Sequence, residues 1–174
     1  TSEWGLNYAN GPIAASFSQL KVDVNGVQAI QSTDAAAGTT TSTVSTAAAK
    51  YTLGNLALSI LNQTNKTNTS SVNTTASTYA VSYTMGNTVL MGQVGEGKAN
   101  AGTYNGSKTK LVGIGADYNL SKRTAIYFRA ESIDDNARMG NSSVNPNAIA
   151  NTTAVNALGD QKFARQAIGL RHSF

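Results

Sequence analysis

Apolar and polar residues alternate along much of the chain, with a repeat of two residues. The alternation is clear at residues 3–8, 79–85 and 111–119. Successive side chains of a β-strand point to opposite faces of a sheet, so this repeat predicts strands with one apolar and one polar face. About nine such segments follow one another, and they lie at residues 3–8, 13–24, 47–53, 56–63, 79–85, 88–96, 111–119, 126–131 and 163–174.

The connections between these strands alternate in length. Short turns are predicted near residues 10–12, 54–55, 86–87 and 120–122. Long polar loops are predicted near residues 25–46, 64–75, 97–107 and 134–161. An up-and-down sheet with short turns at one rim and long loops at the other is typical of transmembrane barrels, whereas a soluble sandwich mixes loop lengths at both ends. The pattern predicts an all-β fold, a transmembrane up-and-down antiparallel β-barrel.

Aromatic residues recur close to the short turns. Tyr8, Tyr51, Tyr83 and Tyr118 each lie two or three residues before a turn, and Phe174 is the last residue of the sequence. Rings at one height of a barrel form an interfacial girdle, where an amphipathic side chain contacts both lipid and headgroups. The general preference of Tyr for strands is the simpler explanation of the same positions.

The polar phase of the strands carries charges, most clearly in the last third of the chain. A charge on the lipid face near the bilayer midplane costs roughly 2–4 kcal/mol, so these side chains are predicted to face a water-filled lumen. The excess of positive charge among them predicts a mild preference for anions, unless the arginines only pair with the carboxylates. The predicted lumen-facing residues are Arg123, Arg129, Arg165, Arg171, Asp117 and Glu131.

Composition excludes several other classes of protein. The chain has no cysteine, which removes disulfide frameworks and thiolate metal sites. Only 13% of residues are charged and the net charge is +4 without a basic run, which argues against nucleic-acid binding. No apolar stretch approaches the roughly 18 residues of a membrane-spanning helix.

The sequence also contains no convincing catalytic or metal-binding constellation. His172 is the single histidine and has no evident base or nucleophile beside it. The Asp134–Asp135 pair is interpreted as the start of a solvated loop rather than as a cation site. We therefore expect no catalytic residues, no metal and no cofactor.

Two segments resemble a known family. Residues 111–124, LVGIGADYNLSKRT, resemble the penultimate hairpin of the general porins of β-proteobacteria, and residues 168–174, IGLRHSF, resemble their C-terminal strand. Together they resemble the anion-selective porins of the Comamonas type. The resemblance is strongest over residues 108–174 and weaker toward the start of the chain.

This resemblance implies a trimer of 16-stranded barrels in the Gram-negative outer membrane. Residues 1–174 would then be the last nine strands, the C-terminal half of one barrel domain, with an N-terminal half holding the constriction loop. The implied partners are outer-membrane lipid and lipopolysaccharide, the N-terminal half, two further copies in a homotrimer, and small anions as solutes. The terminal Phe174 would also be read during barrel assembly.

The functional hypothesis is passive diffusion of small hydrophilic solutes through the lumen. A soluble or surface-exposed β-domain that binds a partner through its long loops, like an adhesin, is the main alternative. A small closed barrel with enzymatic activity is a further alternative, although the lumen-facing phase lacks the histidine and serine groups that it would need.

Overall fold

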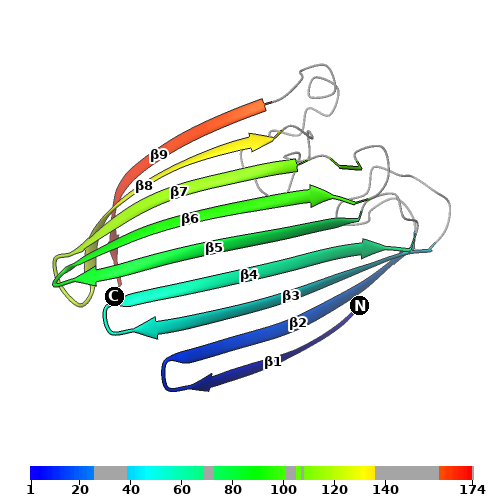
Figure 1. The fold of residues 1–174 in the computed structure, drawn as a ribbon, viewed down its shortest axis with the longest axis horizontal. Helices are drawn as coiled ribbons and strands as arrows, with labels where there is room; N and C mark the ends of the chain where they lie inside the picture. The colour runs from blue at the N-terminus through cyan, green and yellow to red at the C-terminus, as the bar shows by residue number, and fades with distance from the viewer. Residues whose placement is uncertain (26–38, 69–72, 101–104, 107, 136–160, 174) are drawn as a thin grey trace.

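Nine antiparallel strands form one sheet in chain order (Figure 1). A computed structural model describes residues 1–25, 39–68, 73–100, 105–106, 108–135 and 161–173. No helix in these ranges is long and apolar enough to cross a membrane. The strands are β1 (Ser2–Asn10), β2 (Ile13–Asn25), β3 (Thr39–Leu53), β4 (Leu56–Thr67), β5 (Thr74–Met85), β6 (Thr88–Ala99), β7 (Lys108–Asn119), β8 (Thr124–Asp135) and β9 (Gln161–His172).

Three of the short turns share one geometry. Gly11, Gly54 and Gly86 each follow the last residue of a strand, and the next strand begins two residues later. Their φ angles are 53°, 57° and 58°, a region that residues with a side chain rarely adopt. Two-residue turns of this kind match the twist of the strands they join. Glycine at this position therefore fixes the register of each hairpin.

The fourth short turn, between β7 and β8, is held by a serine. The Ser121 hydroxyl oxygen accepts hydrogen bonds from the backbone N–H groups of Arg123 and Thr124, each at 3.1 Å. All four turns lie at one end of the sheet, as Figure 1 shows. The short turns share one rim, as predicted, whereas the long loops predicted for the other rim extend into residues outside the described ranges.

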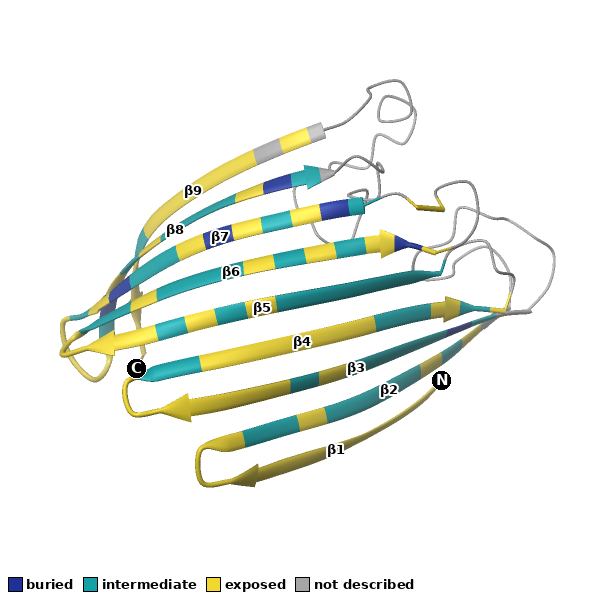
Figure 2. Cartoon of the chain, viewed as in Figure 1, coloured by how far each residue is buried: buried dark blue, intermediate teal, exposed yellow. Residues whose placement is uncertain are grey.

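The two faces of the sheet differ in character. Residues paired in register share a face, and the register places Lys50, Ser59, Ala80, Gln93 and Gly113 on one of them. The sheet curves around this concave face (Figure 1). Along β6 and β7, successive residues largely alternate between exposed and partly covered, as Figure 2 shows. In the described part of the chain the most buried apolar residues, Ala99, Ala125 and Ile133, all belong to the concave phase.

The convex face carries large apolar side chains that no described residue covers. Ile168, Leu6 and Ile114 have 79%, 69% and 60% of their surface exposed. A soluble single-layer sheet would leave this surface in water at a large free-energy cost. A strand of 12 residues is about 40 Å long, which spans a hydrocarbon layer of roughly 30 Å when tilted.

Several strands are longer than the sequence predicted. β3 begins at Thr39 and β4 continues to Thr67, inside the loops expected at 25–46 and 64–75, and β6 continues to Ala99 inside the loop expected from 97. The ends of β3 and β4 are rich in Thr and Ser, which fit a strand well but show no apolar alternation. The expected loops were therefore too long by several residues.

The turn geometry leads to a prediction about stability. Replacing Gly86 by Ala places a Cβ atom at positive φ, which should lower the free energy of unfolding by about 1–2 kcal/mol. Gly92→Ala is the control, because it lies within a strand where the nearest atom to a new Cβ, Val81 Cγ1, is 3.6 Å away. Urea titration of both variants measures the difference, and equal stabilities would contradict the assignment.

Candidate functional site

The concave face of β7, β8 and β9 gathers most of the charged side chains predicted to face the lumen. Asp117 lies opposite Tyr127 in the β7–β8 register, and Glu131 lies opposite Arg165 in the β8–β9 register. Arg129 lies on the same face of β8, two residues before Glu131. Its register partner on β7, Gly115, is two residues before Asp117. The sequence prediction that these groups share a face is consistent with the register.

Asp117 is the centre of this cluster. Its Oδ1 lies 2.7 Å from Arg129 Nη1, and its Oδ2 lies 3.5 Å from Arg171 Nη2. The carboxylate side chain is only 11% exposed, while the two arginines are 40% and 60% exposed. One carboxylate thus neutralises part of the charge of two guanidinium groups. Both arginines remain partly exposed on the concave side.

Arg171 reaches Asp117 across the intervening strand. Arg171 is on β9 and Asp117 on β7, and the residue of β8 opposite Arg171 is Ala125. Ala125 is 3% exposed. A small residue at this position leaves room for the arginine side chain above it.

Arg129 lies flat along the wall. Besides Asp117, its Nη1 donates to the backbone carbonyl oxygen of Phe128 at 2.7 Å and of Ala116 at 3.2 Å. Its guanidinium carbon is 5.6 Å from the centroid of the Tyr127 ring, a cation–π distance. These contacts fix the position of the charge.

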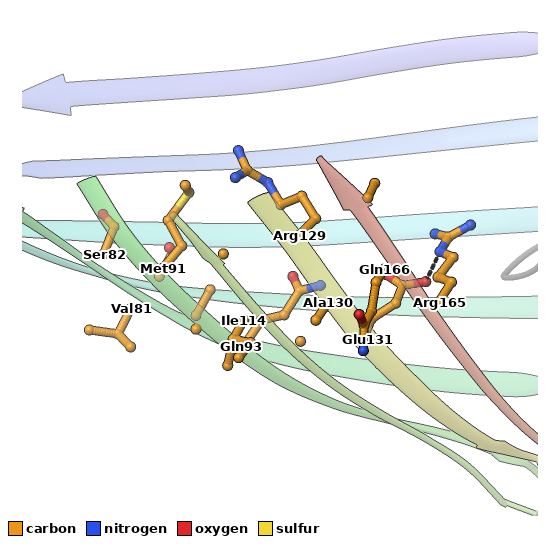
Figure 3. A pocket seen from close by; sticks show the side chains of 16 residues that line it. Val81, Ser82, Met91, Gln93, Ile114, Arg129, Ala130, Glu131, Arg165 and Gln166 are labelled. Atoms are coloured by element: carbon orange, nitrogen blue, oxygen red, sulfur yellow. Dashed lines mark ion pairs between the residues drawn. The ribbon is translucent and has the colours of Figure 1, made fainter. Parts of the chain in front are cut away.

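A second ion pair joins Glu131 and Arg165 (Figure 3). The Glu131 side chain is 19% exposed and that of Arg165 is 52% exposed. Figure 3 shows Ser82, Met91 and Arg129 on one side of the sheet and Val81 on the other. The concave surface around these groups encloses a cavity of about 570 Å³.

The concave face of β1 to β5 is lined by small residues around one amine. A hollow of about 590 Å³ is bordered by Lys50 together with the small inward residues Ala9, Ala14, Ser16 and Ala48. Within the described ranges Lys50 forms no ion pair, and its side chain is exposed. It is therefore a cation of the wall that no carboxylate offsets.

The structure places the other predicted site residues at the rims. Tyr8, Tyr51, Tyr83 and Tyr118 all lie on the convex face near the short turns, with 45–55% of their surface exposed. Arg123 lies in the β7–β8 turn rather than on a strand, so it stands apart from the charged cluster. Phe174 lies outside the described residues.

Several residues of this wall are not evident from the sequence. Lys50 alternates with the convex residues Tyr51 and Leu53 along the strand. This alternation is the signal that could have placed it on the concave face. Tyr127 and Gln93 were not considered because neither carries a charge. Their positions opposite glycines on adjacent strands depend on pairing between strands, which the sequence alone does not give.

The convex face changes character toward the long connections. The register row Glu96, Lys110, Asp134 and Lys162 crosses β6 to β9 just beyond the apolar Val94 and Val112. Two ion pairs form here, Lys108 with Glu96 at 3.1 Å and Lys162 with Asp134 at 3.4 Å. Asp134 is thus part of an ion pair, and the residues that the structure describes contain no group of three metal-binding side chains.

The charged cluster yields a prediction that is independent of transport. Asp117→Asn should lower the free energy of unfolding by about 1–3 kcal/mol, because Arg171 loses a charged hydrogen-bond acceptor and Arg129 loses its ion-pair partner. Glu131→Gln should have a smaller effect, since Glu131 serves one arginine and is more exposed. Urea unfolding of the two variants tests the ranking, and a larger effect of Glu131→Gln would contradict the central place of Asp117.

Comparison with known proteins identifies the family. The sequence pattern of the Gram-negative porins matches residues 3–138. Comparison with curated proteins gives no match.

Solved structures show the same fold. Outer-membrane expressed OmpT of Vibrio cholerae has a TM-score of 0.64 at 14% identity, over 98% of this chain and 55% of that protein. The loop L8 deletion mutant of the same outer membrane protein gives 0.63 at 15% identity, over 98% and 52%. The in-vitro folded protein gives 0.59 at 14% identity, over 98% and 54%.

The chain spans about half the length of these solved structures. At such low identity the likeness concerns the fold alone, and that fold is the wall of an outer-membrane β-barrel. The family match covers most of the nine strands, and the uncovered apolar face agrees with it. The chain belongs to the Gram-negative porin family and resides in the outer membrane.

Proposed function

We propose that the chain forms part of the wall of a water-filled pore for passive diffusion of small hydrophilic solutes. The proposal rests on the difference in polarity between the two faces of the sheet. The convex face presents exposed Ile, Leu and Val side chains, while the concave face presents ion-paired arginines and a lysine that forms no ion pair with any described residue. A lipid-facing outside and a hydrated inside account for both.

The pore requires more strands than this chain supplies. Neither β1 nor β9 pairs with the other, so each has a neighbour on one side only. Unpaired strand edges are not tolerated in hydrocarbon, and closure of the barrel removes them. The proposed arrangement is a 16-stranded barrel in which these nine strands are the C-terminal half, joined to an N-terminal half and assembled as a homotrimer.

A mild preference for anions follows from the charges of the wall. In the described part of the concave phase the cations are Lys50, Arg129, Arg165 and Arg171, and the carboxylates are Glu3, Asp117, Glu131 and Asp135. The two signs are equal in number, so the proposed preference rests on which charges are paired. The arginines are paired, so Lys50 contributes the clearest uncompensated charge. Positive charge on the wall raises the local anion concentration. The resemblance of the last two strands to Comamonas-type porins supports the same sign.

The selectivity proposal predicts the behaviour of one variant. Lys50→Gln should shift the reversal potential in a salt gradient toward that of a non-selective pore, because it removes a lumen charge. The shift should be modest, since the proposed constriction lies in the other half of the barrel. Planar-bilayer recording measures it.

Lys110→Gln is the matched control, because it removes the same charge from the convex face. A cation-selective wild-type pore would refute the proposed selectivity. Equal shifts from Lys50→Gln and Lys110→Gln would show that neither charge acts through the lumen.

The other functions considered from the sequence fit the structure less well. A soluble partner-binding domain would expose the whole convex apolar face to water. An enzyme needs a nucleophile or an acid–base pair, whereas the carboxylates of the charged cluster are engaged by arginines. No catalytic activity is part of the proposal.

We further propose that lipopolysaccharide contacts the convex face near the long connections. Lys66, Lys98 and Lys110 lie beyond the apolar belt, and within the described ranges they form no ion pair. Phosphate groups on lipid headgroups at this level would meet these amines. Near an anionic membrane surface each lysine contributes about 1 kcal/mol.

The double variant Lys98→Gln/Lys110→Gln should therefore bind lipopolysaccharide about 2 kcal/mol more weakly. Titration of the detergent-solubilised protein with fluorescent lipopolysaccharide gives the affinity. Lys50→Gln is the control and should bind as the wild type does. An unchanged affinity of the double variant, or an equal loss in Lys50→Gln, would disprove this lipid contact.

A further inference from the structure

Three long side chains of the concave face each lie directly opposite a glycine on the adjacent strand. Gln93 of β6 pairs with Gly113 of β7 in the register. Arg129 of β8 pairs with Gly115 of β7, and Tyr127 of β8 pairs with Gly169 of β9.

The long side chains occupy the space that a Cβ atom would take. A Cβ on Gly169 would lie 2.5 Å from both Cζ and the hydroxyl oxygen of Tyr127. A Cβ on Gly115 would lie 2.9 Å from Arg129 Cδ, and one on Gly113 would lie 3.0 Å from Gln93 Cγ. The Tyr127 ring has the closest approach, so it is pressed against the backbone of β9.

We infer that Gly169, by lacking a Cβ atom, leaves a space in which the Tyr127 ring packs, here called its seat. We infer that this pair sets the free width of the pore next to the charged cluster. This inference rests on the proposed pore function. While the hydroxyl end of the ring lies over Gly169, the ring takes little of the lumen. Any side chain at position 169 removes the seat, because the contacts would be far shorter than van der Waals distance.

A displaced ring is directed toward the lumen by its neighbours in the wall. On the β7 side, the position opposite Tyr127 is held by Asp117, which is engaged by Arg129 and Arg171. Along its own strand, the guanidinium of Arg129 is 5.6 Å from the ring centroid. The backbone closes the space beneath. Water-filled space on the concave side is the remaining direction.

The test compares single-channel conductance in planar bilayers. Gly169→Ala should conduct less than the wild type, because the ring then projects into the pore. Tyr127→Ala should conduct at least as well as the wild type. In the double variant Gly169→Ala/Tyr127→Ala the loss should disappear, since no ring remains to be displaced.

Gly92→Ala is the matched control and should leave conductance unchanged. It makes the same substitution on the convex face of β6, where a Cβ meets only Val81 Cγ1 at 3.6 Å. Wild-type conductance in Gly169→Ala would overturn the inference. A loss that persists in the double variant would also overturn it, because the cause would then be the strand and not the ring.

A chemical readout separates this inference from the proposed function. Nitration of Tyr127 from the aqueous phase, located by peptide mass mapping, should be faster in Gly169→Ala than in the wild type. An unchanged rate would refute the seat even if the pore conducts. If the wild-type protein forms no channel, the proposed function fails, and the width-setting role fails with it even where nitration accelerates.

Discussion

Hydrogen bonding between adjacent strands is the constraint on which the rest of this wall depends. A lipid environment offers no alternative partner to the backbone, so every strand must pair along its length. Pairing fixes the register, and the register decides which side chains reach the lumen. A slip of one residue in β8 would turn Arg129 and Glu131 toward lipid and bring Phe128 inside. The alternation of the sequence makes such a slip very unfavourable.

The concave face also depends on small residues that leave space for its long charged side chains. Asp117 holds two arginines at the wall, and Ala125 leaves the space through which one of them passes. The glycines opposite Arg129 and Tyr127 act in the same way, because they let long side chains lie along the backbone. The wall therefore combines bulky polar groups with an open interior. Glycine and alanine on the concave face are as important to this arrangement as the charged residues.

The sequence predicted the last three strands best, because apolar and charged residues alternate strictly there. It predicted the ends of β3 and β4 poorly, since Thr and Ser fit both a strand and a loop. Apolar and polar residues do not alternate clearly around Gln19 and Leu20 of β2, and only the register shows that Leu20 faces Val44 on the concave face. The contact between Asp117 and Arg171 joins residues 54 positions apart, and only the pairing of the strands brings them together.

The repeated turn geometry has an evolutionary consequence. Gly11, Gly54 and Gly86 close three hairpins in the same way, each with a two-residue link and the same phase on both strands. Such a hairpin is a self-contained module, since inserting or deleting one leaves the inside and outside of every remaining strand unchanged. Barrels of different circumference are therefore accessible by duplication or loss of whole hairpins, without redesign of the strands that are kept.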